Sequence, residues 1–507
     1  MAEVIKFGTD GWRAVIAEEF TYANVERVAY AVGLYVRENY PAGTPLLIGY
    51  DTRFMADKFA ERAGQVLMAM GVPVKVTSRD VPTPCIAWAT QHETTAGALQ
   101  FTASHNPPEY CGVKYIPEYA GPATDDISAK IVGNLSRTPA HIECSKEDVP
   151  HFDPQPPYLG SVANLINMKK IVSSGIKVGF DALYSTSRGY LDHILRQWGV
   201  PVKVLHDVRD PLFGGGMPEP KKQYLRDLSG LVKTEKLDVG LATDGDADRF
   251  AVIDEQGNYF SPNQLLCLLT MHMVKNRKEK GAIVRTVATT HFLDQLAKKY
   301  DLEVIETPVG FKFIGEEMRN RDILIGGEES GGMSFKGHIP EKDGIMANLL
   351  LVEMMAFEGK PLSQIWDDLQ KEIGYDFTYL RADMRLNDFT QKGLMKILTE
   401  KPLETLAGEK VTRVGRKDGL KLYLDESNWL LIRPSGTEPL IRLYYEGTSS
   451  ERINKVAEDF AKQVEAIVSD LEKEAEKASK TSKTTKKDQS AAKKSPAGPI
   501  ETVGAKA

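Results

Sequence analysis

The sequence predicts an α/β protein of several domains, followed by a smaller α+β domain and a tail without fixed structure. A chain of 507 residues is too long for one hydrophobic core and suggests three or four domains. Segments with the pattern strand, helix, strand occur three times before residue 373, which predicts mostly parallel sheets with right-handed crossovers. Beyond that point, alternating apolar and polar residues indicate an antiparallel sheet.

The first repeat begins with the apolar strand PLLIGYD at residues 45–51. An amphipathic helix at 57–71 and a second strand at 72–78 complete the unit. The second and third repeats follow the same order. Their segments are 176–182, 187–199 and 200–206, then 281–287, 291–300 and 302–308. The three units look like versions of one design, although their identity is too low to prove a duplication.

The C-terminal part of the chain has a different character. KLYLDES, NWLLIRP and LIRLYYEG are strand-like and typical of an α+β unit. The segment 471–507 is rich in Lys, Ser, Thr and Ala and has almost no large apolar residue, so we expect a disordered tail. Its lysines suit an electrostatic tether, but a solvated extension is the simpler interpretation. We therefore expect domains at 1–155, 156–262, 263–372 and 373–470, before the tail at 471–507.

Composition excludes several classes of function. A hydrophobic content of 42% and a charged content of 26% are typical of a globular protein. The net charge of -6 argues against a nucleic acid partner. The four cysteines are widely spaced and form no C-x-x-C, which predicts reduced thiols rather than disulfides or a zinc site. No signal peptide or membrane-length apolar run is present. We expect a cytoplasmic monomer or homodimer without a membrane partner.

The stretch FTASHNPPEYCGVKY at residues 101–115 contains the first candidate site. It follows the apolar run AGALQF, which has the length and composition of a buried strand. The tandem prolines after Asn106 fix the backbone and can continue neither a helix nor a sheet. Ser104, with His105 beside it, is therefore expected on a stiff loop at the end of a strand. The carboxyl ends of parallel strands are where open α/β sheets bind ligands.

A second loop, in LDVGLATDGDADRF, carries Asp244, Asp246 and Asp248 between small residues. Three carboxylates on one tight loop repel each other unless a hard cation lies between them, and oxygen ligands suit Mg²⁺. An EF-hand begins with the same pattern, and Glu255 stands at its twelfth position. However, Arg249 occupies the sixth position, where an EF-hand needs Gly, and the following FAVID is strand-like. We therefore interpret the loop as a magnesium site rather than an EF-hand or a solvated turn.

A third loop lies within DILIGGEESGGMSFKGHIPEKDG. Its glycines allow a ligand to approach the backbone closely, while Glu328 and Ser330 offer acceptors and a donor. A carboxylate beside a hydroxyl can bind paired sugar hydroxyls. The signal is not specific, because an ordinary glycine-rich turn is an equally good interpretation.

A fourth motif, LIRPSGTEPLIRLYYE, combines guanidinium groups, hydroxyls and backbone N–H groups around one turn. This combination is suited to an anion, and to a phosphate in particular. A purely structural arginine would not need the neighbouring Ser-Gly-Thr. We call this set the phosphate cradle, and its members are Arg433, Ser435, Gly436, Thr437 and Arg442.

Together these motifs resemble the α-D-phosphohexomutase family, which includes phosphoglucomutases and phosphomannomutases. FGTDGWR, TASHNPPEYCGVKY, DGDADR, GEESGG and RPSGTEPLIR follow the order of the family and span nearly all of residues 1–470. The resemblance implies three related α/β domains and a smaller one similar to the TATA-binding-protein fold, around a central cleft. It also implies a phosphorylated serine as the working form.

By this resemblance, Ser104 is the phosphoserine and exchanges phosphoryl groups with a sugar phosphate. The intermediate is a hexose 1,6-bisphosphate, which also acts as an activator. Mg²⁺ held by Ser104 and the three aspartates stabilises the transferred group. Lys114 is implied in proton transfer, and Arg13 and Arg249 are suited to phosphate oxygens. His105 either supports the serine or has only a structural role.

The resemblance also assigns both ends of the substrate. The phosphate cradle would bind the phosphate that does not react. Glu328 and Ser330 would bind the O3 and O4 hydroxyls, which lie similarly when the bisphosphate binds in either direction. Lys312 of TPVGFKFIG and Lys342 of EKDG would contact the hexose or its phosphate.

One position departs from the pattern of bifunctional bacterial members and phosphoglucosamine mutases, which read GE-x-SGH. Gly332 stands here in place of that histidine, which assists proton transfer. The chain has His338 in GHIPEKDG, similar to the glucose-preferring branch, and this histidine is either a substitute or an ordinary loop residue. TPVGFKFIG also resembles that branch. We therefore expect glucose rather than mannose as substrate, with dual specificity as the alternative.

Two other functions fit part of the sequence. A metal-dependent phosphohydrolase would use Asp-bound Mg²⁺ and a nucleophile, but it would not need Arg433 and Arg442. A non-catalytic phosphosugar-binding relative would have no reason to keep Ser104, the aspartates and Lys114. A serine hydrolase fits poorly, because G-x-S-x-G is absent.

Overall fold

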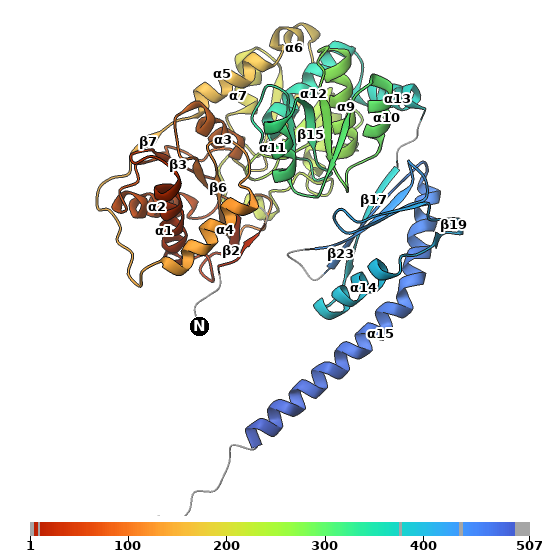
Figure 1. The fold of residues 1–507 in the computed structure, drawn as a ribbon. Coiled ribbons are helices and arrows are strands. Elements are labelled where there is room, and N and C mark those ends of the chain that lie inside the picture. Colours follow the sequence, from red (N-terminus) through yellow and green to blue (C-terminus); the bar gives the residue numbers. More distant parts are fainter. Residues whose placement is uncertain (1–4, 9–10, 375–377, 436–439, 492–507) are drawn as a thin grey trace, which may run out of the picture. The chain divides into compact units, whose positions relative to one another are not determined.

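The computed structural model describes residues 5–8, 11–374, 378–435 and 440–491 (Figure 1). The chain divides into two compact units, residues 1–376 and 377–507. The first unit contains three sheets with helices packed on them, and the second contains a five-stranded sheet and a small two-stranded one. The predicted α/β class and the C-terminal α+β region are both confirmed.

The first sheet has seven strands in the order β1-β2-β6-β5-β3-β4-β7. Its strands are β1 (Phe7–Gly8), β2 (Gly11–Val15), β3 (Leu46–Tyr50), β4 (Val74–Thr77), β5 (Ala98–Phe101), β6 (Tyr110–Ile116) and β7 (His151–Phe152). The helices are α1 (Tyr22–Asn39), α2 (Ala56–Ala69), α3 (Thr83–His92), α4 (Asp125–Asn134) and the 3₁₀ helix η1 (Leu135–Arg137). One continuous core forms between α1, α2 and the sheet because their apolar residues recur at helical spacing.

The second sheet has the order β12-β11-β10-β8-β9. Its strands are β8 (Val178–Asp181), β9 (Val202–Leu205), β10 (Val239–Thr243), β11 (Phe250–Ile253) and β12 (Tyr259–Phe260). The helices of this region are α5 (Gln155–Leu165), α6 (Met168–Ser174), α7 (Leu191–Gln197), the 3₁₀ helix η2 (Phe213–Gly215) and α8 (Arg226–Glu235).

The third sheet has the order β14-β13-β15-β16. Its strands are β13 (Ala282–Thr286), β14 (Val304–Thr307), β15 (Ile323–Gly327) and β16 (Met333–Phe335). The helices are α9 (Pro262–Lys275), α10 (Phe292–Tyr300), α11 (Phe311–Asn320), α12 (Gly344–Glu358) and α13 (Leu362–Ile373). Residues 344–356 of helix α12 are all buried and most of them are apolar, so the helix is enclosed on all sides.

The three sheets share one plan. In each, the first strand of the repeat pairs in parallel with the second on one side and with the third on the other. The third strand is then followed by a loop and an antiparallel strand. The loops at this place are those between β5 and β6, β10 and β11, and β15 and β16. They are the three loops that the sequence marks as candidate sites, so the candidate residues occupy equivalent positions in three versions of one unit.

A small turn supports this equivalence. In all three repeats, a side-chain oxygen at the end of the first strand accepts a hydrogen bond from the backbone N–H two residues later. The accepting residue is either the last residue of the strand or the one after it. Asp51 accepts from Arg53, Asp181 from Leu183, and Thr286 from Ala288, at 2.9, 2.9 and 3.2 Å. The repeated turn agrees with the expectation that the three units are versions of one design.

The second unit is built on an antiparallel sheet in the order β17-β23-β22-β21-β20. Its strands are β17 (Thr378–Arg385), β20 (Arg413–Gly415), β21 (Leu420–Tyr423), β22 (Trp429–Pro434) and β23 (Leu440–Gly447). Strands β18 (Thr405–Leu406) and β19 (Glu409–Lys410) form the small sheet, and the helices are α14 (Asp388–Glu400) and α15 (Ser450–Ala491). The sheet core contacts one face of α15 through Val456, Phe460, Val464 and Leu471.

Helix α15 corrects the prediction for the tail. Residues 471–491 continue the helix rather than being disordered (Figure 1). Their Ala, Glu and Lys content favours helix, and the packed first half of α15 provides the nucleus from which the helix extends. Residues 492–507 lie outside the described part of the chain. Of the helices that the structure describes, none has the length and apolar character required to cross a membrane.

Candidate active site

Ser104 lies on the loop between β5 and β6, as the sequence predicts. Its backbone has a left-handed conformation, with φ of 49°, which is unusual for a residue other than glycine. The Thr102 hydroxyl accepts a hydrogen bond from the Ser104 N–H at 2.9 Å. The Ser104 Oγ donates to Asp244 Oδ2 at 2.9 Å and lies 3.3 Å from His105 Nδ1. The serine therefore faces the aspartate loop of the second repeat.

Asp244, Asp246 and Asp248 are buried together on the loop between β10 and β11. Each offers an oxygen that lies within 4.8 Å of the others. Burial, followed by the charges of its two neighbours, raises the pKa of Asp244 well above its ordinary value. The buried Oδ1 atoms of Asp246 and Asp248 accept no hydrogen bond within the described residues. Three converging carboxylates with unused oxygens fit a hard cation such as Mg²⁺.

Two lysines approach the same carboxylates. Lys114 Nζ on β6 lies 3.0 Å from Asp246 Oδ2 and 3.5 Å from Asp248 Oδ2. Lys342 Nζ lies 3.2 Å from Asp248 Oδ2 and 2.7 Å from Glu341. Both lysines use Oδ2 atoms, which leaves the Oδ1 atoms of Asp246 and Asp248 for another cation. The three predicted groups, Lys114, Lys342 and the aspartates, therefore meet.

Thr83 at the start of α3 fixes Asp246, and sequence reasoning missed it. Its hydroxyl donates to Asp246 Oδ2 at 2.6 Å, and its N–H donates to the Asp246 carbonyl at 2.9 Å. Burial alone would raise the pKa of Asp246, but the Lys114 charge and the Thr83 hydrogen bond hold that pKa below its ordinary value. The sequence offered only a weak signal, because Thr83 lies five residues beyond the predicted strand at 72–78.

Arg13 and Arg249 frame the serine loop. Arg13 Nη1 on β2 donates to the Asn106 side chain at 2.9 Å. The Arg249 N–H donates to Asp244 Oδ1 at 3.1 Å, and its Nε lies 4.0 Å from Asp248. The charge of Arg249, burial and the charge of Arg13 hold the pKa of His105 well below its ordinary value. His105 is therefore neutral at pH 7 and can accept a hydrogen bond.

Glu328 and Ser330 lie on the loop between β15 and β16. Glu328 Oε2 accepts from the Ser330 hydroxyl at 3.2 Å, and Oε1 accepts from the Gly310 N–H at 3.1 Å. Burial, and then the charge of Glu329, raises the pKa of Glu328 to about 7. The Gly310 turn of TPVGFKFIG is thus part of the Glu328 site.

The third loop also contacts the aspartate loop. Arg249 forms an isolated antiparallel bridge with Gly332, and the Phe250 N–H donates to the Gly331 carbonyl at 3.3 Å. The Gly344 N–H donates to the Ala247 carbonyl at 3.0 Å. All three candidate loops of the first unit therefore meet in one place, as the rule for the carboxyl ends of strands predicts.

Two predicted residues have other partners in the structure. The side chain of His338 is buried, and its Nε2 is 2.7 Å from Asp343 Oδ2, while Asp343 Oδ1 caps α12. This contact favours the interpretation of His338 as a structural residue of the loop. Lys312 on α11 is 2.5 Å from Asp125 on α4. Its contact with a hexose therefore stays a prediction.

Position 332 has no room for a side chain larger than that of glycine, because Lys342 fills the adjacent space. A Cβ at this position would lie 2.3 Å from Lys342 Cδ and 2.8 Å from Cγ. A histidine here would displace Lys342 from Asp248. The side chain of Lys342 therefore packs against Gly332, the position at which the resemblance leads one to expect a histidine.

The phosphate cradle lies on the second unit, at the ends of β22 and β23. Arg433 and Arg442 are paired across the two strands, and Arg433 Nε is 2.8 Å from Asp418 Oδ2. The Ser435 N–H donates to the Leu440 carbonyl at 2.9 Å. Gly436 and Thr437 lie outside the described residues, so the cradle as a whole stays a prediction.

Arg53 is a second residue that sequence reasoning missed. It lies after β3, is fully buried, and binds carbonyl oxygens of the Ser104 loop. Its partner Asp51 lies 3.2 Å from Arg53 Nε, and burial raises the pKa of Asp51 to about 6 despite the arginine charge. The signal was the pair Asp-x-Arg at the carboxyl end of the strand PLLIGYD.

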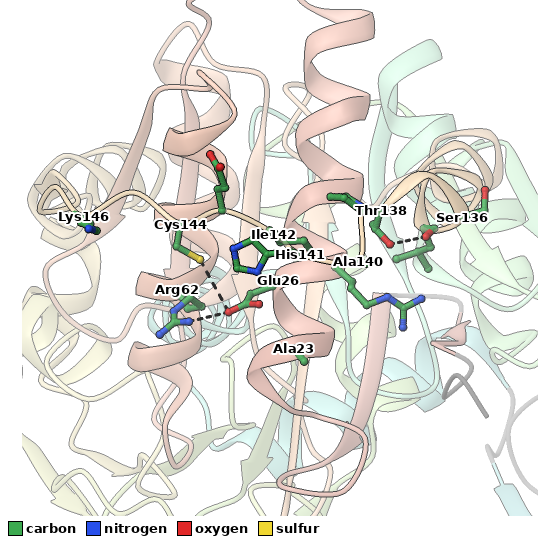
Figure 2. Close-up of a pocket in the computed structure, with 14 residues that line it drawn as sticks. Ala23, Glu26, Arg62, Ser136, Thr138, Ala140, His141, Ile142, Cys144 and Lys146 are labelled. Atoms are coloured by element: carbon green, nitrogen blue, oxygen red, sulfur yellow. Dashed lines mark hydrogen bonds and ion pairs between the residues drawn. The ribbon is translucent and has the colours of Figure 1, made fainter.

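A separate cavity of about 950 Å³ lies in the first domain, between α1, α2 and the segment 135–146 (Figure 2). Arg62 donates to Glu26 at 2.7 Å, and the Cys144 sulfur is 4.0 Å from the same carboxylate. The residues that line the cavity include none of the three candidate loops. The chemistry predicted from the sequence is therefore not located there.

Four family models match the chain in order. They describe phosphoglucomutase/phosphomannomutase domains I, II and III, each α/β/α, and the C-terminal domain. The matched residues are 4–140, 156–257, 261–373 and 394–463.

Relatives of known name agree with these models. A phosphoglucomutase/phosphomannomutase of Thermococcus kodakarensis is 31% identical over 460 residues, covering 89% of this chain and 96% of the relative. A phosphoglucosamine/phosphogalactosamine mutase of Sulfurisphaera tokodaii is 28% identical and covers 90% of this chain and 99% of its own. A crystal structure assigned as a Thermus thermophilus phosphomannomutase has a TM-score of 0.81 and 33% identity, covering 92% of this chain and all of the other.

Proposed function

The chain belongs to the phosphoglucomutase/phosphomannomutase family of phosphohexomutases, and we propose that it interconverts glucose 1-phosphate and glucose 6-phosphate. The family consists of isomerases that transfer a phosphoryl group. The observation that carries the proposal is the 2.9 Å hydrogen bond between the Ser104 hydroxyl and Asp244 within a buried group of three aspartates. A hydroxyl held against a cation site is suited to carry a phosphoryl group.

The three aspartates, together with Ser104, would hold Mg²⁺. The fit rests on the unused Oδ1 atoms of Asp246 and Asp248 and on a donor set made only of oxygen. When bound, the ion supplies positive charge that neutralises the transferred group. Thr83 and Lys114 would keep Asp246 oriented and ionised for this purpose.

The residues of the chain then divide the work of transfer. A sugar hydroxyl attacks the phosphorus of phosphorylated Ser104, and its oxygen bonds to phosphorus as the bond from phosphorus to Oγ breaks. The proton of the attacking hydroxyl would pass by way of Lys114 to the departing Oγ, and neutral His105 remains as a hydrogen-bond partner of Oγ. Arg13 and Arg249 bind oxygens of the phosphoryl group.

The bisphosphate formed in this step must bind again in the opposite direction. Glu328 and Ser330 would hold the O3 and O4 hydroxyls in both directions, and the phosphate cradle would bind whichever phosphate does not react. Hexose 1,6-bisphosphate would therefore also serve as the activator that phosphorylates Ser104. Lys312 and Lys342 would contact the hexose or its phosphate.

Preference for glucose rests on the segments TPVGFKFIG and GHIPEKDG and on the place of Lys342. The side chain of this lysine lies beside Gly332, the position at which a histidine would assist proton transfer. Phosphomannomutase or dual activity is the second candidate. A relative named phosphoglucomutase/phosphomannomutase is 31% identical to this chain, and a structure named phosphomannomutase is 33% identical to it. We further propose a cytoplasmic monomer or homodimer.

A coupled assay tests the proposal. Glucose 1-phosphate, mannose 1-phosphate and glucosamine 1-phosphate are compared in the presence of Mg²⁺ and a catalytic amount of hexose 1,6-bisphosphate. The highest kcat/KM is expected for glucose 1-phosphate. A higher value for either other sugar would overturn the substrate assignment, and release of inorganic phosphate without isomerisation would indicate a phosphohydrolase.

A further inference from the structure

Arg53 uses its whole guanidinium group on the loop that carries Ser104. The side chain is fully buried between β3 and that loop. Nη1 and Nη2 donate to four backbone carbonyl oxygens, and Nε donates to Asp51. The four carbonyls are those of Ser104 at 2.7 Å, Asn106 at 2.6 Å, Pro107 at 2.7 Å and Tyr110 at 2.9 Å. An arginine has five N–H donors, and all five are used here.

The four carbonyl oxygens depend on Arg53 for hydrogen bonds. Three of them, those of Ser104, Asn106 and Pro107, lie in the turn that Pro107 and Pro108 exclude from helix and sheet, and the fourth belongs to Tyr110 at the start of β6. The Pro107 carbonyl also accepts from the Tyr110 N–H at 3.1 Å, but loss of the arginine would remove a donor from all four carbonyls, which is unfavourable where water does not reach them. One planar group with fixed donor directions satisfies all four, which a lysine with three donors cannot do.

The position of Arg53 connects this loop to its neighbours. Asp51 accepts from Arg53 at both its N–H and its Nε, so the side chain starts from a fixed base. The Phe213 ring of η2 lies 5.2 Å from the guanidinium carbon. On the other side of the loop, the Ser104 carbonyl lies so close to Gly245 that a Cβ there would be 2.5 Å away. Movement of Arg53 would therefore change the separation of Ser104 from the aspartates.

We propose that Arg53 is a positioning residue, which holds the Ser104 turn in its left-handed form so that Oγ faces Asp244 during both phosphoryl transfers. The proposal rests on the proposed function of Ser104. Its physical content is independent of the sugar, because every contact is made within the protein. Arg53 touches neither Oγ nor the phosphoryl group, and it acts through the backbone of the loop.

Arg53→Lys tests this directly, and Asp51→Asn tests it without removing the arginine. We expect Arg53→Lys to lower kcat by about 100-fold, the cost of a displacement of about 1 Å at the reacting atom. KM for the sugar phosphate should change little, because the substrate contacts remain. Hydrogen exchange of the amides of residues 104–106, 109 and 110 should become faster in both variants. Arg62→Lys, in the same domain but paired with Glu26, is the matched control and should change none of these.

The readouts separate the possible outcomes. Variants that fold, exchange normally at these loop amides and keep wild-type kcat would overturn the proposal, as would a lower melting temperature with unchanged kcat and exchange. If Arg53→Lys does not fold, Asp51→Asn and its loop exchange decide the question. Absence of phosphoserine from the wild-type protein would instead overturn the proposed function, and faster loop exchange would still support the positioning of the turn by Arg53.

Discussion

Gly245→Ala perturbs the contact between the serine loop and the aspartate loop. The backbone of Gly245 does not need glycine, since its φ lies outside the left-handed region. The obstacle is space, because a Cβ would lie 2.5 Å from the Ser104 carbonyl oxygen and 3.2 Å from Pro218 Cβ. A separation under 3.0 Å from a backbone atom is not tolerated, so the loops must part by about 0.5 Å or more.

The size of the effect follows from that displacement. A shift of about 1 Å in the reacting geometry costs about 100-fold in rate, so we expect kcat of Gly245→Ala to fall by about 10- to 100-fold. Gly230→Ala is the matched control, because this glycine lies on α8 of the same domain with no atom within 4 Å of an added Cβ. The assay measures kcat for glucose 1-phosphate and the rate at which Ser104 is phosphorylated by the bisphosphate. Wild-type values for both in Gly245→Ala would refute the close fit of the two loops.

Three further predictions use the same protein. Asp246→Asn should reduce the dependence of turnover on Mg²⁺ and slow transfer by about 100-fold or more, since it removes charge from the cation site; wild-type turnover in excess chelator would contradict this. Glu328 has a raised pKa of about 7, so the folded state holds its proton more tightly and the stability that this supplies is lost as the pH rises from about 4.5 through 7. The melting temperature of Glu328→Gln relative to wild type should therefore rise between pH 5 and pH 8, and a constant difference would be inconsistent with the buried carboxyl. Arg433→Ala or Arg442→Ala should strongly lower kcat/KM for sugar phosphates, because binding energy from the remote phosphate orients the reacting end, while hydrolysis of the phosphoserine by water should change much less. Unchanged mutase activity in both arginine variants would show that the phosphate cradle does not bind the substrate.

Much of the fold follows from the sequence because its signals are local. The apolar strands and amphipathic helices of the three repeats lie within a few residues of their predicted places. The meeting of Ser104 with Asp244 was also predictable, since both follow strands whose carboxyl ends lie at one edge of their sheets. Spacing and residue type were sufficient for these features.

Other features depend on contacts that no local pattern contains. Nothing near Arg53 in the sequence indicates which carbonyls of a loop about 50 residues later turn inward to meet it. The partner of His338 is the residue that caps α12, which is visible only once the helix start is known. The helix beyond residue 471 was missed because its composition satisfies a test for disorder and also favours helix.

The most direct test of the account is the site of phosphorylation. Wild-type protein and Ser104→Ala are incubated with glucose 1,6-bisphosphate and Mg²⁺, and the phosphorylated peptide is mapped by mass spectrometry alongside turnover of glucose 1-phosphate. The account predicts one phosphoryl group on Ser104 in the wild type, and neither phosphorylation nor turnover in a Ser104→Ala protein that keeps its fold. A phosphoryl group on a different residue, or isomerisation by Ser104→Ala, would contradict it.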